Sequence, residues 1–138
     1  MNEVLEWGAK ILKHRHKNIN DAVMFDIDDT LIESSTGKPM NMPLRLLNFA
    51  KSLGYIIIII TARPKTEEAA KFTLEQLKQF NIEPHWLIFS TAEEKGDIKK
   101  QLLQYNFVLS IGDQITDITN TKHFIKLPNY NDPKIYYN

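Results

Sequence analysis

Three acidic residues, Asp26, Asp28 and Asp29, lie within four positions directly after the apolar run 23–25. Such a run predicts a buried strand, which delivers the residues that follow it to the C-terminal edge of a sheet, where α/β folds place their ligands. Three crowded carboxylates repel one another unless a cation or a shared proton relieves them. This stretch therefore predicts a divalent-metal site with an aspartate poised for chemistry.

Phosphoryl transfer is the chemistry that these acids suggest. Extended backbone would point Asp26 and Asp28 to one side, where they could act as nucleophile and proton donor. A carboxylate that attacks phosphorus needs a Mg²⁺ ion and cationic groups, because the carboxylate and the phosphate ester are both negatively charged and repel each other. Asp26 and Asp113 offer the hard oxygen ligands that Mg²⁺ prefers, and Asp117, one helical turn later, could hold a metal-bound water.

The phosphoryl oxygens need donors and positive charge, which the hydroxyl of Thr61 and the ammonium of Lys95 or Lys99 could supply. Each of these residues also has an ordinary structural interpretation. Thr61 could cap a turn, Asp113 could cap the helix after it, and both lysines could be solvated. It is the ordered set, with each member at the end of a suitable element, that favours a catalytic site.

The elements that must position these residues alternate between strand and helix. The five isoleucines 56–60 have no polar break, which predicts a central parallel strand covered on both faces. Helices are expected at 2–17, 43–53, 66–80, 91–105 (weakened by Gly96) and 114–120, and strands at 22–27, 55–60, 86–89, 107–111 and, as an edge strand, 124–127. This order predicts a parallel sheet with right-handed crossovers, so that Asp26, Thr61 and Asp113 meet at one sheet edge.

The 138 residues predict a single domain, with an N-terminal helix in 1–20, a core at 22–127 and a tail at 128–138. Acidic and basic residues balance, so no net charge favours nucleic acid or membrane binding, and the absence of cysteine excludes thiolate metal sites. The N-terminus lacks the order of a secretory signal, and no apolar run could span a bilayer. We therefore expect a cytoplasmic protein.

Two further segments allow a functional and a plainer interpretation. The basic cluster Lys13–Lys17 could bind an anion or nucleic acid, but a solvated helix C-terminus explains it more simply. The polar tail 128–138 could recruit a partner, but docking on the domain is the plainer expectation.

At these residues the chain resembles the haloacid dehalogenase (HAD) superfamily of phosphohydrolases. Phe25-Asp26-Ile27-Asp28-Asp29-Thr30-Leu31 resembles its first motif, and Ile56–Ile60 followed by Thr61 resembles the second. Lys95 resembles the third, and Gly112-Asp113-Gln114-Ile115-Thr116-Asp117 the fourth. The match runs from about residue 22 to 118, and four motifs in order are highly specific. It implies a three-layer, Rossmann-like α/β domain.

Within the superfamily, Thr61-Ala62-Arg63-Pro64 and Lys95-x-x-x-Lys99 resemble the acid-phosphatase branch of plant storage-type and bacterial class B and class C enzymes. That branch usually has Arg where Lys99 stands. The resemblance implies that Asp26 is the nucleophile and that Asp28 is the general acid and later the general base. It implies Mg²⁺ held by Asp26, Asp113 and the main-chain carbonyl of Asp28, and phosphate bound by Thr61 and Lys95, with Ala62 beside them. Asp117, Lys99 and Arg63 would support this site. Asp29 has no assigned catalytic role in the motif, and we interpret it as a residue that either supports the site or caps a loop.

The gaps between the motifs have no room for the cap domain that many relatives insert, so we expect an open site. An open site suits a phosphoprotein, a nucleic-acid end or a nonspecific phosphatase activity. The leading hypothesis is thus a Mg²⁺-dependent phosphomonoesterase. The alternatives are a catalytically weak phosphate-binding or regulatory module and a phosphatase for nucleic-acid ends. A phospho-receiver domain fits less well, because the central strand ends in Thr61 rather than in an acceptor aspartate.

Overall fold

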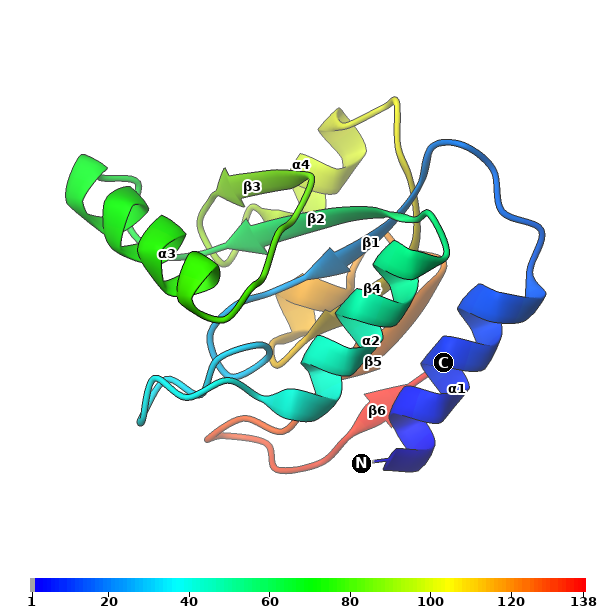
Figure 1. The fold of residues 1–138 in the computed structure, drawn as a ribbon, viewed down its shortest axis with the longest axis horizontal. Coiled ribbons are helices and arrows are strands. Elements are labelled where there is room, and N and C mark those ends of the chain that lie inside the picture. The colour runs from blue at the N-terminus through cyan, green and yellow to red at the C-terminus, as the bar shows by residue number, and fades with distance from the viewer. Residues whose placement is uncertain (1) are drawn as a thin grey trace.

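The computed structural model describes residues 2–138, in which strands and helices alternate along most of the chain (Figure 1). The elements are α1 (Asn2–His14), β1 (Asp21–Phe25), α2 (Asn41–Ser52), β2 (Ile56–Thr61), α3 (Glu67–Gln79), β3 (Trp86–Phe89), α4 (Lys95–Gln101), β4 (Asn106–Gly112), the 3₁₀-helix η1 (Ile115–Ile118), β5 (His123–Lys126) and β6 (Tyr136–Tyr137). The α/β architecture that the sequence predicts is confirmed.

A six-stranded sheet with the order β3-β2-β1-β4-β5-β6 forms the centre of the molecule. The first five strands in this order pair in parallel, and β6 pairs antiparallel with β5. The strand order reverses direction between β1 and β4, the kind of switch point at which open α/β sheets bind ligands. We therefore expect a ligand site at the residues that follow β1 and β4.

The isoleucine run of β2 explains why helices cover both faces of the sheet. Ile57 and Ile59 pack into a core cluster with residues of α1 and α2, whereas Ile58 and Ile60 pack on the other face, toward α4. All four side chains are fully buried, and burial of each contributes roughly 1.5–3 kcal/mol. A strand with one solvent-exposed face would leave half of these isoleucine side chains in water.

The predicted helix at 91–105 is wrong in length, since α4 spans only Lys95–Gln101. Gly96, expected to weaken the middle of this helix, lies at its start instead. Gly96 lies in the first turn of α4, where a Cβ atom would stand 2.4 Å from Oγ1 of Thr119. The glycine therefore allows the end of η1 to approach the helix closely.

Three further expectations need correction. Helix α1 ends at His14 rather than near residue 17, and the predicted helix at 114–120 is the single 3₁₀ turn of η1. The predicted edge strand β5 lies inside the sheet, because the tail forms β6 along its outer side. The ring of Tyr137 in β6 lies 5.0 Å from that of Trp7 in α1, so the tail docks on the domain.

The basic cluster Lys13–Lys17 is mostly a solvated surface, as the plainer interpretation holds, but Arg15 departs from it. Arg15 forms an ion pair with the buried carboxylate of Asp21 at the start of β1. Among the residues that the structure describes, no helix is long and apolar enough to cross a membrane.

Candidate active site

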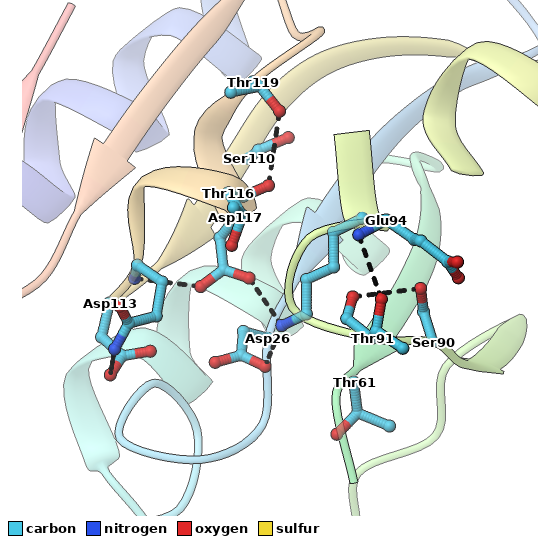
Figure 2. Close-up of polar contacts among 12 residues, drawn as sticks. Asp26, Thr61, Ser90, Thr91, Glu94, Ser110, Asp113, Thr116, Asp117 and Thr119 are labelled. Atoms are coloured by element: carbon cyan, nitrogen blue, oxygen red, sulfur yellow. Dashed lines mark hydrogen bonds and ion pairs between the residues drawn. The ribbon is translucent and has the colours of Figure 1, made fainter. Parts of the chain in front are cut away.

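The ends of three neighbouring strands meet at one edge of the sheet, as the alternation of elements predicts. Asp26 follows β1, Thr61 ends β2 and Asp113 follows β4 (Figure 2). A cavity of about 350 Å³ opens here, lined by Asp26, Asp28, Asp29, Ser34, Ala62, Ala92, Lys95, Asp113, Gln114 and Thr116. Most of the predicted site residues therefore share one cavity.

Thr61 is the exception among the residues expected to bind phosphate. Its side chain is fully buried, and it is not among the residues that line the cavity. Its hydroxyl accepts a hydrogen bond from the backbone N–H of Arg63 at 3.2 Å. Ala62, the next residue, is exposed and forms part of the cavity wall.

Asp26, Asp113 and Asp117 turn toward one another and form an acidic cluster (Figure 2). One carboxylate oxygen from each lies within 4.8 Å of the others, and all three residues are buried. An all-oxygen, anionic donor set of this kind fits a hard cation such as Mg²⁺. The cluster brings Asp117 closer to this candidate metal centre than the sequence indicated.

Lys95 at the start of α4 connects two members of the acidic cluster. Its Nζ lies 2.7 Å from Oδ1 of Asp26 and 2.6 Å from Oδ1 of Asp117. Burial on its own would lower the pKa of Lys95, but the attraction of the two carboxylates outweighs it and raises that pKa. Lys95 therefore stays charged inside the protein.

One ammonium group does not balance three carboxylates. Burial, together with repulsion from Asp117, raises the pKa of Asp26 well above its ordinary value, although Lys95 opposes the shift. Burial likewise raises the pKa of Asp113, and the charge of Asp117 adds to it. The cluster holds the excess negative charge that a divalent cation would offset.

Asp28 is not part of the acidic cluster and pairs with Arg63. The guanidinium donates from Nε to Oδ2 at 3.1 Å and from Nη2 to Oδ1 at 2.9 Å, and its Nη1 donates to Thr73. The expected alternation of Asp26 and Asp28 along a strand does not occur, because β1 ends at Phe25 and the chain turns after it. Both side chains nevertheless line the same cavity.

Lys99 lies beneath the site rather than in the cavity. Its buried Nζ donates to the carbonyl of Asp117 at 2.6 Å, to the carbonyl of Thr119 at 2.8 Å and to Oγ of Ser110 at 3.0 Å. Burial lowers the pKa of Lys99 to about 7. These contacts connect α4, β4 and η1, so Lys99 holds the backbone that carries Asp117.

Gly112 and Asp29 allow the backbone to pack closely around the site. At Gly112, a Cβ atom would stand 2.2 Å from Cβ of Asp117, so only glycine lets the acidic cluster pack against the end of β4. Asp29 adopts a left-handed backbone (φ 58°), and its carboxylate accepts hydrogen bonds from the N–H and the hydroxyl of Ser34. Asp29 thus caps the loop that borders the cavity.

Two residues near the site had no assigned part in the sequence analysis. Gln114 forms a capping box with Asp117, and its N–H donates to Oδ2 of that residue at 3.1 Å. Asn129, in the tail, donates from Nδ2 to the main-chain carbonyl of Asp113. The position of Gln114 inside the fourth motif was a signal, whereas nothing local to Asn129 indicated this contact.

Comparison with known protein families gives one match. The model of the family described as HAD superfamily, subfamily IIIB (Acid phosphatase) matches residues 33–133. The matched range contains Thr61, Lys95 and Asp113 and begins after Asp28. A search of curated proteins finds no match.

Proposed function

Since the chain belongs to the HAD superfamily, subfamily IIIB acid phosphatases, and is a phosphomonoester hydrolase by that membership, we propose that it works through an aspartyl-phosphate on Asp26 and depends on Mg²⁺. The observation that carries the proposal is the buried carboxylate of Asp26, which lines the cavity beside Lys95 and two further carboxylates. A carboxylate in this position can reach a phosphorus atom that is bound in the cavity.

In the proposed reaction, an Asp26 oxygen attacks the phosphorus, and the bond from phosphorus to the leaving oxygen breaks. Asp28 donates a proton to the leaving oxygen and then accepts one from the water that hydrolyses the phospho-Asp26. The product is inorganic phosphate, and both aspartates return to their starting state. Asp28 fits this exchange because its side chain is 44% exposed and can reach both substrate and solvent.

Phosphate binding is assigned to Lys95 and Ala62, which line the cavity, whereas the buried hydroxyl of Thr61 supports the loop through Arg63. An ammonium group has three N–H donors, and two of those of Lys95 engage Asp26 and Asp117, which leaves one for a phosphoryl oxygen. Mg²⁺, held by Asp26, Asp113 and the main-chain carbonyl of Asp28, would supply charge that offsets the repulsion between nucleophile and phosphate. Asp117, which forms an ion pair with Lys95, would help to keep these groups in position.

The proposed site is open, so that the leaving group of the substrate is not enclosed by the protein. Between β1 and β2 lie a loop and α2, and between β2 and α4 lie α3 and β3, so the described part of the chain places no folded cap over the site. Cavities of about 270 Å³, beside Arg63 and Phe72, and about 450 Å³, beside Pro64 and Phe89, adjoin the central one. The leaving group therefore has room on two sides.

The basic cluster Lys13–Lys17 gives no support to a preference for nucleic-acid ends. Through Arg15 it contacts Asp21, the first residue of β1, whereas Asp26 follows the last residue of that strand. The cluster thus lies toward the opposite edge of the sheet. A substrate bound at Asp26 would contact Lys95 rather than the cations of this cluster.

The test is a panel of phosphomonoesters assayed with Mg²⁺ and, separately, with a chelator. The panel holds an aryl phosphate, nucleotides, sugar phosphates, phosphopeptides and end-phosphorylated oligonucleotides. We expect turnover with Mg²⁺ that the chelator removes. Binding of Mg²⁺ and phosphate without turnover of any substrate would instead favour a regulatory phosphate-binding module, and turnover that survives the chelator would contradict the Mg²⁺ dependence.

A further inference from the structure

The peptide group between Asp113 and Gln114 is held from both sides. Its carbonyl oxygen accepts a hydrogen bond from Nδ2 of Asn129, and its N–H donates to Oδ2 of Asp117 at 3.1 Å. The plane of a peptide group sets the direction of the side chain that precedes it, because only two backbone dihedral angles separate neighbouring planes. These two hydrogen bonds therefore fix the direction in which the Cα–Cβ bond of Asp113 leaves the backbone, and so the point from which its carboxylate reaches the acidic cluster.

The segment after β5 also binds the main-chain carbonyl of Gly112, one residue earlier in the chain. The backbone N–H of Leu127 donates to the carbonyl of Gly112 at 2.8 Å. Two successive carbonyls at the end of β4 are thus bound by residues two positions apart on one neighbouring segment. An amide side chain at 129 continues the hydrogen bonding beyond the point where β5 ends at Lys126.

Asn129 itself is held in place by its own turn. Its Oδ1 accepts hydrogen bonds from the N–H groups of Asn131 and Asp132 at 2.8 and 2.7 Å, which leaves Nδ2 to point at Asp113. The buried side chain of Lys126 secures the far side of the turn, with Nζ 3.4 Å from a carboxylate oxygen of Asp132 and 3.4 Å from the carbonyl of Lys134. The donor is therefore presented from a fixed scaffold.

We propose that Asn129 is a positioning residue for Asp113, and that through it the tail sets the affinity of the site for its metal. The inference rests on the proposed function, since it takes Asp113 to be a ligand of Mg²⁺. Partners in the outer shell of a metal site orient the ligands, and their loss typically lowers metal affinity or activity about 10- to 100-fold. Asn129 acts on the main chain of the ligand rather than on its carboxylate.

The test separates the amide donor from the turn that presents it. Asn129→Ser keeps an oxygen that can accept the two N–H bonds of the turn, but its side chain is shorter and has no amide donor. Asn129→Ala loses both the donor and the turn acceptor. Asn131→Ala is the matched control, because Asn131 is exposed and only its backbone N–H takes part in the turn.

We expect calorimetric titration of the intact protein with Mg²⁺ to give a dissociation constant about tenfold higher for Asn129→Ser and Asn129→Ala than for wild type, and an unchanged one for Asn131→Ala. In steady-state assays, the Mg²⁺ concentration for half-maximal rate should rise by the same factor, and saturating Mg²⁺ should restore kcat. Thermal unfolding of each metal-free variant shows whether it is folded.

Each outcome decides between specific claims. Wild-type affinity in Asn129→Ser overturns the positioning role and leaves the proposed function intact. Weakened affinity in Asn129→Ala alone also overturns it, because the turn and not the donor would then be responsible. If the wild-type protein binds no Mg²⁺, the proposed metal site is wrong, and the inference falls with it.

Discussion

Arg63 holds both carboxylate oxygens of Asp28, with Nη2 2.9 Å from Oδ1 and Nε 3.1 Å from Oδ2. The guanidinium is itself fixed by its third contact, to Oγ1 of Thr73 at 3.1 Å. A bidentate pair of this kind gives the carboxylate one orientation rather than many. Both oxygens accept hydrogen bonds in this pair, so the orientation that it fixes is that of the carboxylate, the form that takes a proton from water in the second step.

Replacing Arg63 by Lys should lower kcat roughly tenfold, which is part of the about 10²–10⁴ that a positioned acid–base group contributes, and should change KM for an aryl phosphate little. Lysine keeps the charge but loses the planar fork that orients Asp28. Initial-rate kinetics at saturating Mg²⁺ measure the effect, with Lys65→Met, an exposed cation two residues away, as the control. A wild-type kcat in Arg63→Lys would show that the pair does not orient Asp28.

Asp26→Asn should abolish turnover of an aryl phosphate, with a loss of roughly a thousandfold or more, because an amide is no nucleophile toward phosphorus. Rapid acid quench with ³²P-labelled substrate should trap a phosphoprotein from wild type and none from the variant. Retained activity, with a folded variant, would refute the assignment of Asp26.

The same substitution should stabilise the metal-free protein, and increasingly so as the pH rises. The raised pKa of Asp26 means that the folded chain keeps its proton at pH values where the unfolded chain, with an ordinary pKa of 3.8, has already lost it. The contribution of Asp26 to the stability of wild type therefore falls as the pH rises from 3.8 through the raised value. The melting temperatures of Asp26→Asn and wild type, both in chelator, should coincide near pH 3.5 and diverge by pH 8, with the variant higher. A constant difference would exclude ionisation of Asp26 as the cause.

Lys95→Met should destabilise the metal-free protein by about 3–5 kcal/mol, the usual effect of removing one partner from a buried ion pair. The change leaves the carboxylates of Asp26 and Asp117 without the cation between them. Urea unfolding at pH 7.5 measures it, and Lys100→Met, an exposed position on the same helix, should lie within about 0.5 kcal/mol of wild type. Adding Asp117→Asn to Lys95→Met should recover part of the loss, and full additivity of the two changes would argue against the ion pair.

Asp21 should show the opposite pH dependence from Asp26. Burial would raise the pKa of Asp21, but hydrogen bonds from the Asn18 N–H, Asn106 and Arg15 outweigh it and lower that pKa. Its contribution to stability is present above the ordinary value of 3.8 and is lost as the pH falls through the lower folded value. Asp21→Asn should therefore be less stable than wild type by about 1–3 kcal/mol at pH 7, and the difference should be smaller at pH 3, measured by denaturant unfolding. An equal difference at both pH values would contradict this account.

The sequence predicts the sheet well because its signals are local and strong. Five consecutive isoleucines allow few placements other than a strand covered on both faces, and an apolar run ending in acids identifies the functional edge of the sheet. Parallel pairing then places the ends of these strands at one edge of the sheet, whereas the order β3-β2-β1-β4 itself is seen only in the structure. The convergence of Asp26 and Asp113 depends only on these rules.

What the sequence does not predict depends on contacts between distant segments. Gly96 looks like a weak point in a long helix until the position of Thr119 shows the close approach that requires it. Likewise, Lys99 looks like one solvated lysine among several, yet its ammonium lies among two carbonyls and a hydroxyl. No pattern along the chain distinguishes a buried lysine from an exposed one on a short helix.

The docking of the tail has a consequence for biosynthesis. Asn129 and β6 follow all four motif segments in the chain, so a ribosome has already made Asp26, Lys95 and Asp113 before it makes the donor that binds the Asp113 carbonyl. Domains generally fold in the order in which they emerge. A nascent chain that stops before residue 129 would thus contain every proposed catalytic group, while the peptide group after Asp113 would still lack its partner. Synthesis of the catalytic residues alone therefore does not complete the site, because the segment that carries Asn129 has to emerge and dock as well.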